Sequence, residues 1–387
     1  MIKFGEIKIN DIAKKHIEDC IFKNHVTMGD KTKLLETLWA TKFGYKAVRA
    51  VSSGTAACTA ACMVLYEFGA QPGDEIIVPG LSFIATANAV RAAGFTPVFC
   101  DIDPDTLVIN EHLIEKLITS KTRALMPVAL MGRPPNMTFI RKLADEYNLK
   151  VILDNCEGHG CKHKGRYMSE YADMVTYSCY AAHILFSGEL GFVGCATDEL
   201  AKLVGSVRSH GRTEGTLAFN HIRYGLNLKP TDLHASIGLG SFGEFDEILL
   251  TRKANLKYIE DSIKKYCKDN SVHNPFSFCE ERTFDNDFNS PHAFSLVCRN
   301  SGFGSVSIKE LQAALSYASI EWKRNFGAMP DHHCFRYLDK TKSCPQSTFV
   351  GNNGLHIGVH QYLTKQDLEH IVKTITDLIQ SKYPKHD

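Results

Sequence analysis

A carboxylate and an imidazole are the side chains of this sequence whose types and surroundings suggest chemistry. Asp154 closes the apolar run Val151-Ile152-Leu153, where a carboxylate can keep the nitrogen of a heterocyclic ring protonated. His183 lies between Ser178 and the turn Gly188-Glu189-Leu190-Gly191, and an imidazole with a free pKa of ~6.5 can take and return a proton at neutral pH. Taken singly, Asp154 is as readily a turn cap, and His183 a core histidine. Together they predict a site that moves protons beside a nitrogen heterocycle.

Three further features add to this prediction. The cluster Ser53-Gly54-Thr55 opens a helical stretch, where small residues, hydroxyls and free N–H groups favour a phosphate. The same residues also form ordinary helix caps, so both interpretations stay open. Phe83, after an expected strand, either stacks on a ring or packs in the core. Glu157, one turn after Asp154, either reaches a hydroxyl oxygen of the ligand or is solvated.

Strands that end near one another must position these side chains. From about residue 47 to residue 200, short β-branched or apolar runs alternate with helical stretches. The runs are residues 76–79, 97–100, 124–128, 151–154, 174–177 and 191–194. This alternation predicts an α/β fold with a mostly parallel central sheet, helices on both faces and ligand sites at the carboxyl ends of strands. Asp154 and Ser178 both fall where such ends are expected.

The segments on either side of this region suggest two domains. Residues 1–35 are predicted to form a leading helical arm with Asp11 as its cap. Beyond about residue 240, the pattern predicts helices over 244–266, 308–318 and 365–381 and strands over 292–297 and 354–358. We therefore predict a large domain with the arm at residues 1–240 and a smaller C-terminal α+β domain at residues 241–387.

Composition narrows the class of protein. The 387 residues are 44% hydrophobic with a net charge of +1, which indicates neither a nucleic acid nor an acidic partner. No apolar run reaches the ~18 residues of a membrane span and the N-terminus lacks a signal-peptide pattern, so a cytoplasmic protein without membrane contact is predicted. The 13 cysteines include no CxxC or CxC pair, and we expect buried or incidental thiols rather than a disulfide framework or a metal site.

A series of motifs in fixed order makes the chain resemble the DegT/DnrJ/EryC1/StrS family of pyridoxal-phosphate sugar enzymes. The motifs are Thr27-Met28-Gly29, Val51-Ser52-Ser53-Gly54, Gly73-Asp74-Glu75-Ile76-Ile77-Val78-Pro79, Asp101-Ile102-Asp103, Asp154-Asn155-Cys156-Glu157, His210-Gly211, Gly225-Leu226-Asn227 and Gly354-Leu355-His356-Ile357-Gly358-Val359-His360-Gln361. The resemblance implies the fold-type I, aspartate aminotransferase-like fold and a homodimer with shared active sites. It also implies pyridoxal 5′-phosphate or pyridoxamine 5′-phosphate as the cofactor.

The same resemblance implies roles for individual residues. The cofactor phosphate would be held by Ser53, Gly54, Thr55 and Ser178, joined by Asn227 across the dimer interface. The cofactor ring would be held by Phe83, Asp154 and Glu157. The substrate contacts would be His210, Arg212, Arg324 and His360, with Arg212 and Arg324 equally interpretable as solvated surface charges.

His183 places the chain near one branch of this family. Its position carries, in the aminotransferases, the lysine that binds the cofactor covalently, and no lysine occurs between Lys164 and Lys202. The chain therefore resembles the histidine-bearing nucleotide-sugar 3-dehydratases, in which His183 would be the catalytic base. The implied reaction removes the C-3 hydroxyl of a 4-keto-6-deoxy sugar, with GDP-4-keto-6-deoxy-D-mannose as the implied substrate. L-Glutamate would restore the amine form of the cofactor, in deoxysugar biosynthesis for surface polysaccharide.

Two departures and two alternatives accompany this interpretation. Ala182 stands where the compared members carry a second histidine, and Leu190 stands where they carry glycine. One alternative is a sugar aminotransferase whose lysine has been replaced. The other is a non-catalytic, cofactor-binding homologue. The nucleotide, whether GDP, CDP, dTDP or UDP, and the choice of hexose or heptose stay open.

Overall fold

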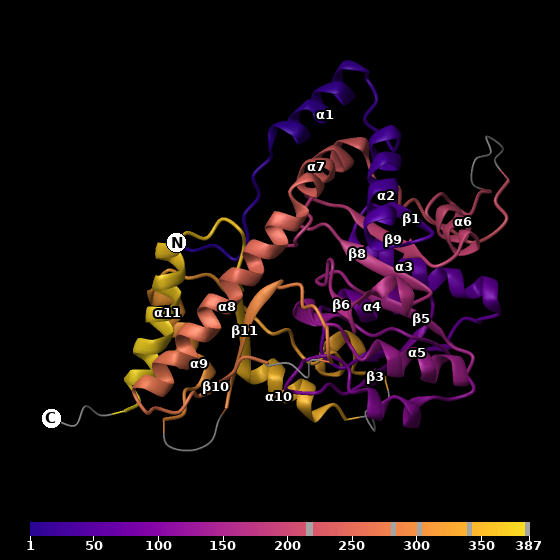
Figure 1. Ribbon diagram of the computed structural model, residues 1–387. Helices are drawn as coiled ribbons and strands as arrows, with labels where there is room; N and C mark the ends of the chain where they lie inside the picture. Colours follow the sequence, from indigo (N-terminus) through magenta and orange to yellow (C-terminus); the bar gives the residue numbers. More distant parts are fainter. Residues whose placement is uncertain (214–219, 280–283, 300–303, 339–342, 384–387) are drawn as a thin grey trace.

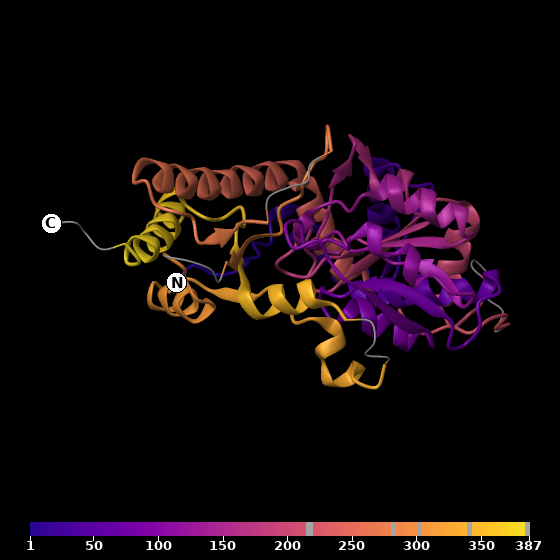
Figure 2. The same cartoon turned by 90° about the horizontal axis from the view of Figure 1, so that it is seen from below.

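The computed structural model describes residues 1–213, 220–279, 284–299, 304–338 and 343–383. The long helix α8 (Phe245–Asp269) runs from the part of the molecule that contains the central sheet to the part formed by the last third of the chain (Figure 1). Seen from below, the two parts lie side by side (Figure 2). The amino terminus lies beside the second part, where Ile2 forms a bridge with Ile320.

A seven-stranded sheet forms the centre of the larger part. Its order is β1-β9-β8-β5-β4-β2-β3. The strands are β1 (Ala47–Val51), β2 (Glu75–Pro79), β3 (Thr96–Cys100), β4 (Thr122–Leu125), β5 (Lys150–Asp154), β8 (Met174–Ser178) and β9 (Gly191–Cys195). Pairing is parallel from β8 to β3, whereas β9 runs antiparallel to both neighbours. The predicted α/β class with a mostly parallel sheet is confirmed.

Helices cover both faces of this sheet because its buried strands alternate apolar side chains between two cores. In β5, Val151 and Leu153 belong to one core and Ile152 belongs to the other. The first core includes residues of α2 (Asp30–Phe43), α5 (Met137–Glu146) and α7 (Asp232–Gly243). The second includes residues of α3 (Gly54–Val64), α4 (Ala85–Ala92) and α6 (Asp198–Val207). The sheet therefore holds its strand ends between two packed layers.

An antiparallel four-stranded sheet, in the order β10-β11-β13-β12, forms the second part. Its strands are β10 (Phe276–Ser277), β11 (Ala293–Cys298), β12 (Trp322–Arg324) and β13 (Gly354–Gly358). The helices here are α9 (Ile308–Tyr317), α10 (Pro345–Asn353) and α11 (Lys365–Gln380). Helices α9 and α11 share a separate hydrophobic core with α8 that also includes Ile2, whereas Val350 of α10 belongs to a different cluster. A boundary at residue 240 stays a prediction.

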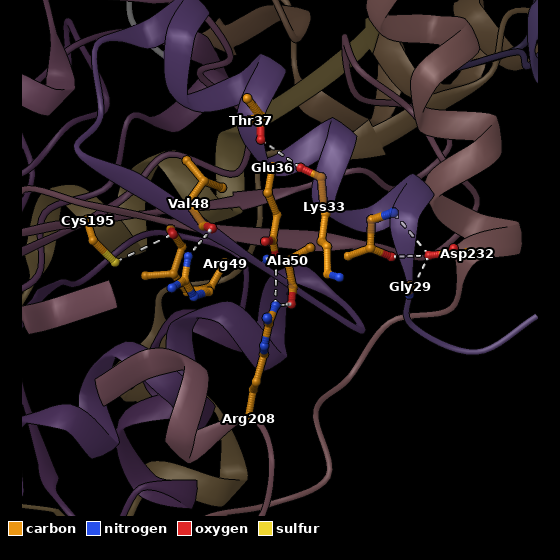
Figure 3. Close-up of polar contacts among 12 residues, drawn as sticks. Gly29, Lys33, Glu36, Thr37, Val48, Arg49, Ala50, Cys195, Arg208 and Asp232 are labelled. Carbon is orange, nitrogen blue, oxygen red and sulfur yellow. Dashed lines mark hydrogen bonds and ion pairs between the residues drawn. The ribbon is translucent and has the colours of Figure 1, made fainter. Parts of the chain in front are cut away.

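The N-terminal arm differs in detail from the expectation. It contains two helices, α1 (Asp11–Phe22) and α2, and Asn10 rather than Asp11 caps α1, because the Asn10 side chain accepts a hydrogen bond from Ala13 N–H. Between them the chain turns where Asp232 accepts hydrogen bonds from the N–H groups of Gly29, at 2.8 Å, and of Thr32 (Figure 3). The predicted cap at Asp11 is therefore wrong by one residue.

The remaining short elements connect these layers. They are the hairpin strands β6 (Lys162–His163) and β7 (Arg166–Tyr167), and the 3-10 turns η1 (Leu65–Phe68), η2 (Glu111–Leu113), η3 (Glu115–Leu117), η4 (Leu130–Gly132), η5 (Met168–Glu170), η6 (Met329–Asp331) and η7 (His333–Phe335). Within the described ranges, no helix combines the length and the apolar character needed to cross a membrane.

Candidate active site

A cavity of about 390 Å³ opens at the carboxyl ends of β5 and β8, beside the start of α3. The predicted residues that line it are Ser53, Gly54, Thr55, Phe83, Asp154, Glu157, Ser178 and His183. They come from four separate segments of the chain. The cavity therefore brings together the expected base and nearly all of the residues expected to hold a cofactor.

Close packing holds the start of α3 against the end of β8. The Ser53 hydroxyl accepts the Ala56 N–H at 3.1 Å, so this segment is also an ordinary helix cap. At Gly54, a Cβ atom would lie 2.5 Å from Ser178 Cβ and 3.1 Å from Cys156 Sγ. Only glycine therefore fits without displacing a neighbour. The start of α3 and the hydroxyl-bearing residues Ser53 and Ser178 line the same cavity, an arrangement suited to an anion.

A buried ion pair fixes the strand that leads into this loop. Glu36 Oε1 accepts hydrogen bonds from Ala50 N–H, at 2.7 Å, and from Arg208 Nη1, at 2.6 Å (Figure 3). The same Arg208 nitrogen donates to the Ala50 carbonyl oxygen at 2.6 Å. Because β1 ends one residue later, the loop from Ser52 starts from a fixed backbone.

Asp154 is buried, with 5% of its surface exposed, and both carboxylate oxygens accept hydrogen bonds. Oδ2 accepts from the Thr86 hydroxyl at 2.7 Å, and Oδ1 accepts from Cys156 N–H at 3.2 Å. The Sγ atoms of Cys58 and Cys156 lie within 4.8 Å of an oxygen of the Asp154 carboxyl group. A hydrogen bond with Cys58, together with burial, raises the pKa of the Cys156 thiol. These hydrogen bonds hold the Asp154 carboxyl group in one orientation among the residues that line the cavity.

The hydrogen bond of His183 shows which of its two ring nitrogens carries the proton. Its Nδ1 hydrogen-bonds the carbonyl oxygen of Cys156, and because a carbonyl only accepts, Nδ1 carries the proton and Nε2 the lone pair. Burial lowers the pKa of His183 to about 4; the Cys156 hydrogen bond opposes this shift, and the charges of Arg252 and Lys323 add to it. At neutral pH the side chain is therefore a base with Nε2 as its accepting atom.

Glu157 lies on the same wall and holds its proton more tightly than an ordinary carboxyl group. Oε2 accepts the Met131 N–H at 2.7 Å, and Oε1 lies 3.8 Å from Nε2 of His292. Burial raises the pKa of Glu157 to about 7, and the hydrogen bond from Met131 opposes this shift. The group can therefore donate or accept a hydrogen bond near neutral pH.

The cavity lining also includes residues, from the N-terminus and the C-terminal part of the chain, that the sequence analysis did not single out as site residues. They are Phe4, His292, Lys323, Phe326 and His356. The Lys323 Nζ lies 4.2 Å from the Phe4 ring centroid, and the His292 ring lies 5.0 Å from that of His183. Each histidine interrupts or adjoins a buried apolar strand. An isolated polar residue in such a strand is the signal that could have identified them.

Three predicted residues lie on neighbouring surface loops outside the lining of the cavity. Asn227 is exposed, and its backbone forms an isolated antiparallel β-bridge with that of Ser209. The His210 N–H donates to the Leu226 carbonyl oxygen at 3.0 Å. Arg212 is half-buried, and its Nη2 lies 3.5 Å from the Ser209 hydroxyl. Their roles in cofactor and substrate binding stay predictions.

The other two predicted substrate contacts also lie outside the lining. Arg324 is exposed and donates to the Gly351 carbonyl oxygen at 2.7 Å. Alternation along β12 places its neighbour Lys323 at the cavity instead. His360 is buried, with Nε2 donating to the Lys3 carbonyl oxygen at 3.2 Å and Nδ1 accepting Tyr362 N–H at 3.3 Å. Both of its ring nitrogens are therefore engaged within the chain.

The mostly parallel sheet, with a cavity at the carboxyl ends of its strands, is the architecture of the pyridoxal-phosphate aminotransferase fold. The chain belongs to the DegT/DnrJ/EryC1/StrS aminotransferase family, whose profile matches residues 8–376. It is 30% identical to the GDP-perosamine synthase of Caulobacter vibrioides over 345 residues, 89% of each chain. It is 25% identical to the GDP-4-keto-6-deoxy-D-mannose 3-dehydratase of Escherichia coli O55:H7 over 388 residues, 94% of this chain and 96% of the relative.

Solved structures agree with this assignment of the fold. GDP-4-keto-6-deoxymannose-3-dehydratase (ColD), solved as a mutant with bound GDP-perosamine, superposes with a TM-score of 0.86 at 23% identity, covering 97% of this chain and all of that one. The sugar aminotransferase CalS13 from Micromonospora echinospora gives a TM-score of 0.86 at 22% identity, covering 97% of this chain and all of that one. The expected fold and family are confirmed.

Proposed function

We propose that this chain is a nucleotide-sugar 3-dehydratase that uses pyridoxamine phosphate. The observation that carries the proposal is His183, a neutral imidazole at the position where the aminotransferases of the family bind their cofactor through lysine. Among the described residues that line the cavity, the one lysine is Lys323, which belongs to β12 of the C-terminal part. An imidazole moves protons and forms no lasting bond to an aldehyde, which favours elimination over transfer of an amine.

The residues present fit the cofactor. The absence of a Cβ at Gly54 lets the start of α3 pack directly against Ser178, so that the N–H groups of the helix start and the Ser178 hydroxyl would hold one phosphate together. Asp154 would pair with the ring nitrogen, and Phe83, 56% exposed beside the cavity, has a free face for stacking. When bound, pyridoxamine phosphate supplies an amine that condenses with a ketone and an electron path that lets a neighbouring hydroxyl leave.

The chain supplies the proton transfers. His183 Nε2 accepts a proton from the carbon that carries the amine, and the resulting imidazolium returns it to the departing C-3 hydroxyl. The Cys156 carbonyl holds the Nδ1 proton throughout, so the ring keeps its orientation. Asp154 would keep the ring nitrogen protonated, and Glu157 would hold the phenolic oxygen. Loss of hydroxide as water leaves a 3-deoxy sugar and ammonia after hydrolysis.

The substrate class and the assembly are parts of the same proposal. The names of two relatives, a GDP-perosamine synthase and a GDP-4-keto-6-deoxy-D-mannose 3-dehydratase, favour a nucleotide-linked 4-keto-6-deoxy sugar. L-Glutamate would restore the amine form. Asn227, His210 and Arg212 lie outside the cavity of their own chain, and in a homodimer they would complete the site of the partner subunit.

A nucleotide-sugar aminotransferase is the second candidate, favoured by the 30% identity to GDP-perosamine synthase. The two functions differ in where the amine nitrogen ends. We would incubate the protein with pyridoxamine phosphate, L-glutamate and GDP-4-keto-6-deoxy-mannose, and follow ammonia and 2-oxoglutarate together. Equal amounts of both are expected from a dehydratase. Production of 2-oxoglutarate without ammonia would identify an aminotransferase.

Two variants assign the base in this assay. His183→Asn removes the accepting nitrogen and should abolish ammonia release while the cofactor still binds. His333→Asn alters an exposed histidine outside the cavity lining and should leave the rate unchanged. Equal activity of both variants would remove His183 from the mechanism. The same assay with CDP-, dTDP- and UDP-linked sugars would identify the nucleotide.

A further inference from the structure

Arg252, which is not part of the cavity lining, hydrogen-bonds the backbone of two lining segments that are far apart in the sequence. This residue of α8 has 1% of its surface exposed. Its Nη1 donates to the Ala182 carbonyl oxygen at 3.1 Å and lies 3.4 Å from that of His292, while its Nη2 donates to the His183 carbonyl oxygen at 3.2 Å. Its Nε donates to Gln361 Oε1 at 3.1 Å. All three carbonyl groups belong to residues that line the cavity.

The partners of this guanidinium are neutral. Among the residues that the structure describes, no aspartate or glutamate forms an ion pair with Arg252. Burial lowers the pKa of Arg252 to about 10, which leaves it charged at neutral pH. A buried cation without a counterion is costly, and carbonyl oxygens compensate for that cost only in part. The rigid fork of an arginine suits this geometry, because its donors diverge at fixed angles to several acceptors.

We propose that Arg252 is a positioning residue for the catalytic base: it fixes the peptide that carries His183 and ties it to the segment that carries His292. The proposal rests on the proposed function of His183 but does not assign Arg252 any contact with substrate or cofactor. The His183 ring is held at Nδ1 by Cys156, and its backbone is held by Arg252, so the imidazole is anchored at both ends. Nε2 is thereby kept at one place on the cavity wall.

The charge of Arg252 acts on the same imidazole. It favours neutral His183, in the same direction as burial and the charge of Lys323. Titratable and charged groups near His183 include Arg252, Lys323, His159, His292 and Tyr180. The carboxyl groups of Asp154, Glu157 and Glu189 line the same cavity. Removing the charge of Arg252 should therefore raise the pKa of His183, whereas Arg252→Lys keeps a cation and should leave that pKa near its wild-type value.

The kinetic test compares Arg252→Gln and Arg252→Lys with a matched control. Arg133 is also buried, donates to one backbone carbonyl group, that of Phe278, at 3.0 Å, and does not act on the pKa of His183, so Arg133→Gln reports the general effect of losing a buried guanidinium. Misplacement of a reacting group by about 1 Å costs roughly 10²-fold in rate. We expect kcat of Arg252→Gln to fall by about that factor with KM changed less than ~3-fold, partial recovery in Arg252→Lys, and near-wild-type kcat in Arg133→Gln.

The second readout does not depend on turnover. Labelling the histidine Cε1 positions with carbon-13, and assigning His183 by its loss in His183→Asn, allows its titration to be followed by NMR without substrate. We expect the His183 signal of Arg252→Gln to titrate at higher pH than in the wild type, and that of Arg252→Lys to stay near the wild-type midpoint. An unchanged midpoint in a folded Arg252→Gln, or equal kinetic losses in the Arg133 and Arg252 variants, would overturn the proposal. The wild type could lack dehydratase activity while the His183 signal still shifts in Arg252→Gln and stays in place in Arg252→Lys. In that case the proposed function is wrong, and the role of Arg252 in positioning His183 stands.

Discussion

Replacement of Gly54 by alanine tests whether the start of α3 holds a phosphate. The added Cβ would lie 2.5 Å from Ser178 Cβ and 3.0 Å from Ser178 Oγ, closer than side-chain carbons normally approach. In most helices glycine-to-alanine replacement stabilises by about 0.5–1 kcal/mol. Here the overlap works against that gain, because overpacking costs about 1–3 kcal/mol. Relief requires Ser178 to move, which displaces one of the hydroxyls proposed to hold the cofactor.

The expected result is a loss of cofactor affinity in a protein that still folds. An overpacking cost of about 1–3 kcal/mol that destabilises the cofactor-bound state raises the Kd for pyridoxal phosphate by roughly 5- to 150-fold. Spectroscopic titration would measure this change. Gly243→Ala is the control, because its Cβ would meet only Ile12 Cδ1 at 3.6 Å, an ordinary contact. Wild-type affinity in Gly54→Ala, or an equal loss in both variants, would refute the phosphate site.

Three further predictions concern charges. Asp154→Asn should lower kcat at least about 10²-fold with the cofactor still bound, and a normal kcat would contradict its role at the ring nitrogen. Glu157 has a pKa of about 7 in the folded chain against 4.5 as its ordinary value, so the folded chain binds more protons and loses stability as pH rises from 4.5 through 7. Urea unfolding should therefore show Glu157→Gln more stable than wild type by about 1–3 kcal/mol at pH 8, a difference that vanishes near pH 4; an equal difference at both pH values would contradict this. Arg208→Met leaves Glu36 buried without its partner and should destabilise the protein by about 3 kcal/mol, seen as a lower Tm, whereas an unchanged Tm would show that Glu36 needs no cation.

The central strands could be predicted because they are buried on both faces of the sheet. The helices of this region were then expected in the stretches between them. Such strands are continuous apolar runs, and those at residues 151–154 and 174–177 fall within β5 and β8. Strand β12 was missed because it has three residues, two of them charged, and no apolar alternation. For the same reason Arg324 was selected, although Lys323 faces the cavity. A three-residue strand shows no period from which its inner face can be identified.

The site residues near the ends of β5 and β8 were predictable from their spacing along the chain, whereas the lining residues of the C-terminal part were not. Asp154, Ser178 and His183 lie within thirty residues of one another, and the family pattern covers this segment. His292, His356 and Arg252 reach the site only through the packing of the C-terminal part against the sheet. The sequence around each of them indicates only an ordinary strand or helix. Their place at the site follows from contacts between segments that are distant in the sequence.

The most direct test of the account is the mass of the sugar produced from GDP-4-keto-6-deoxy-mannose with pyridoxamine phosphate and L-glutamate. A dehydratase with His183 as base predicts a product that lacks one oxygen of the substrate and contains no nitrogen from glutamate, and no such product from His183→Asn. A product that keeps the C-3 oxygen and carries an amino group at C-4 would contradict the account and identify an aminotransferase.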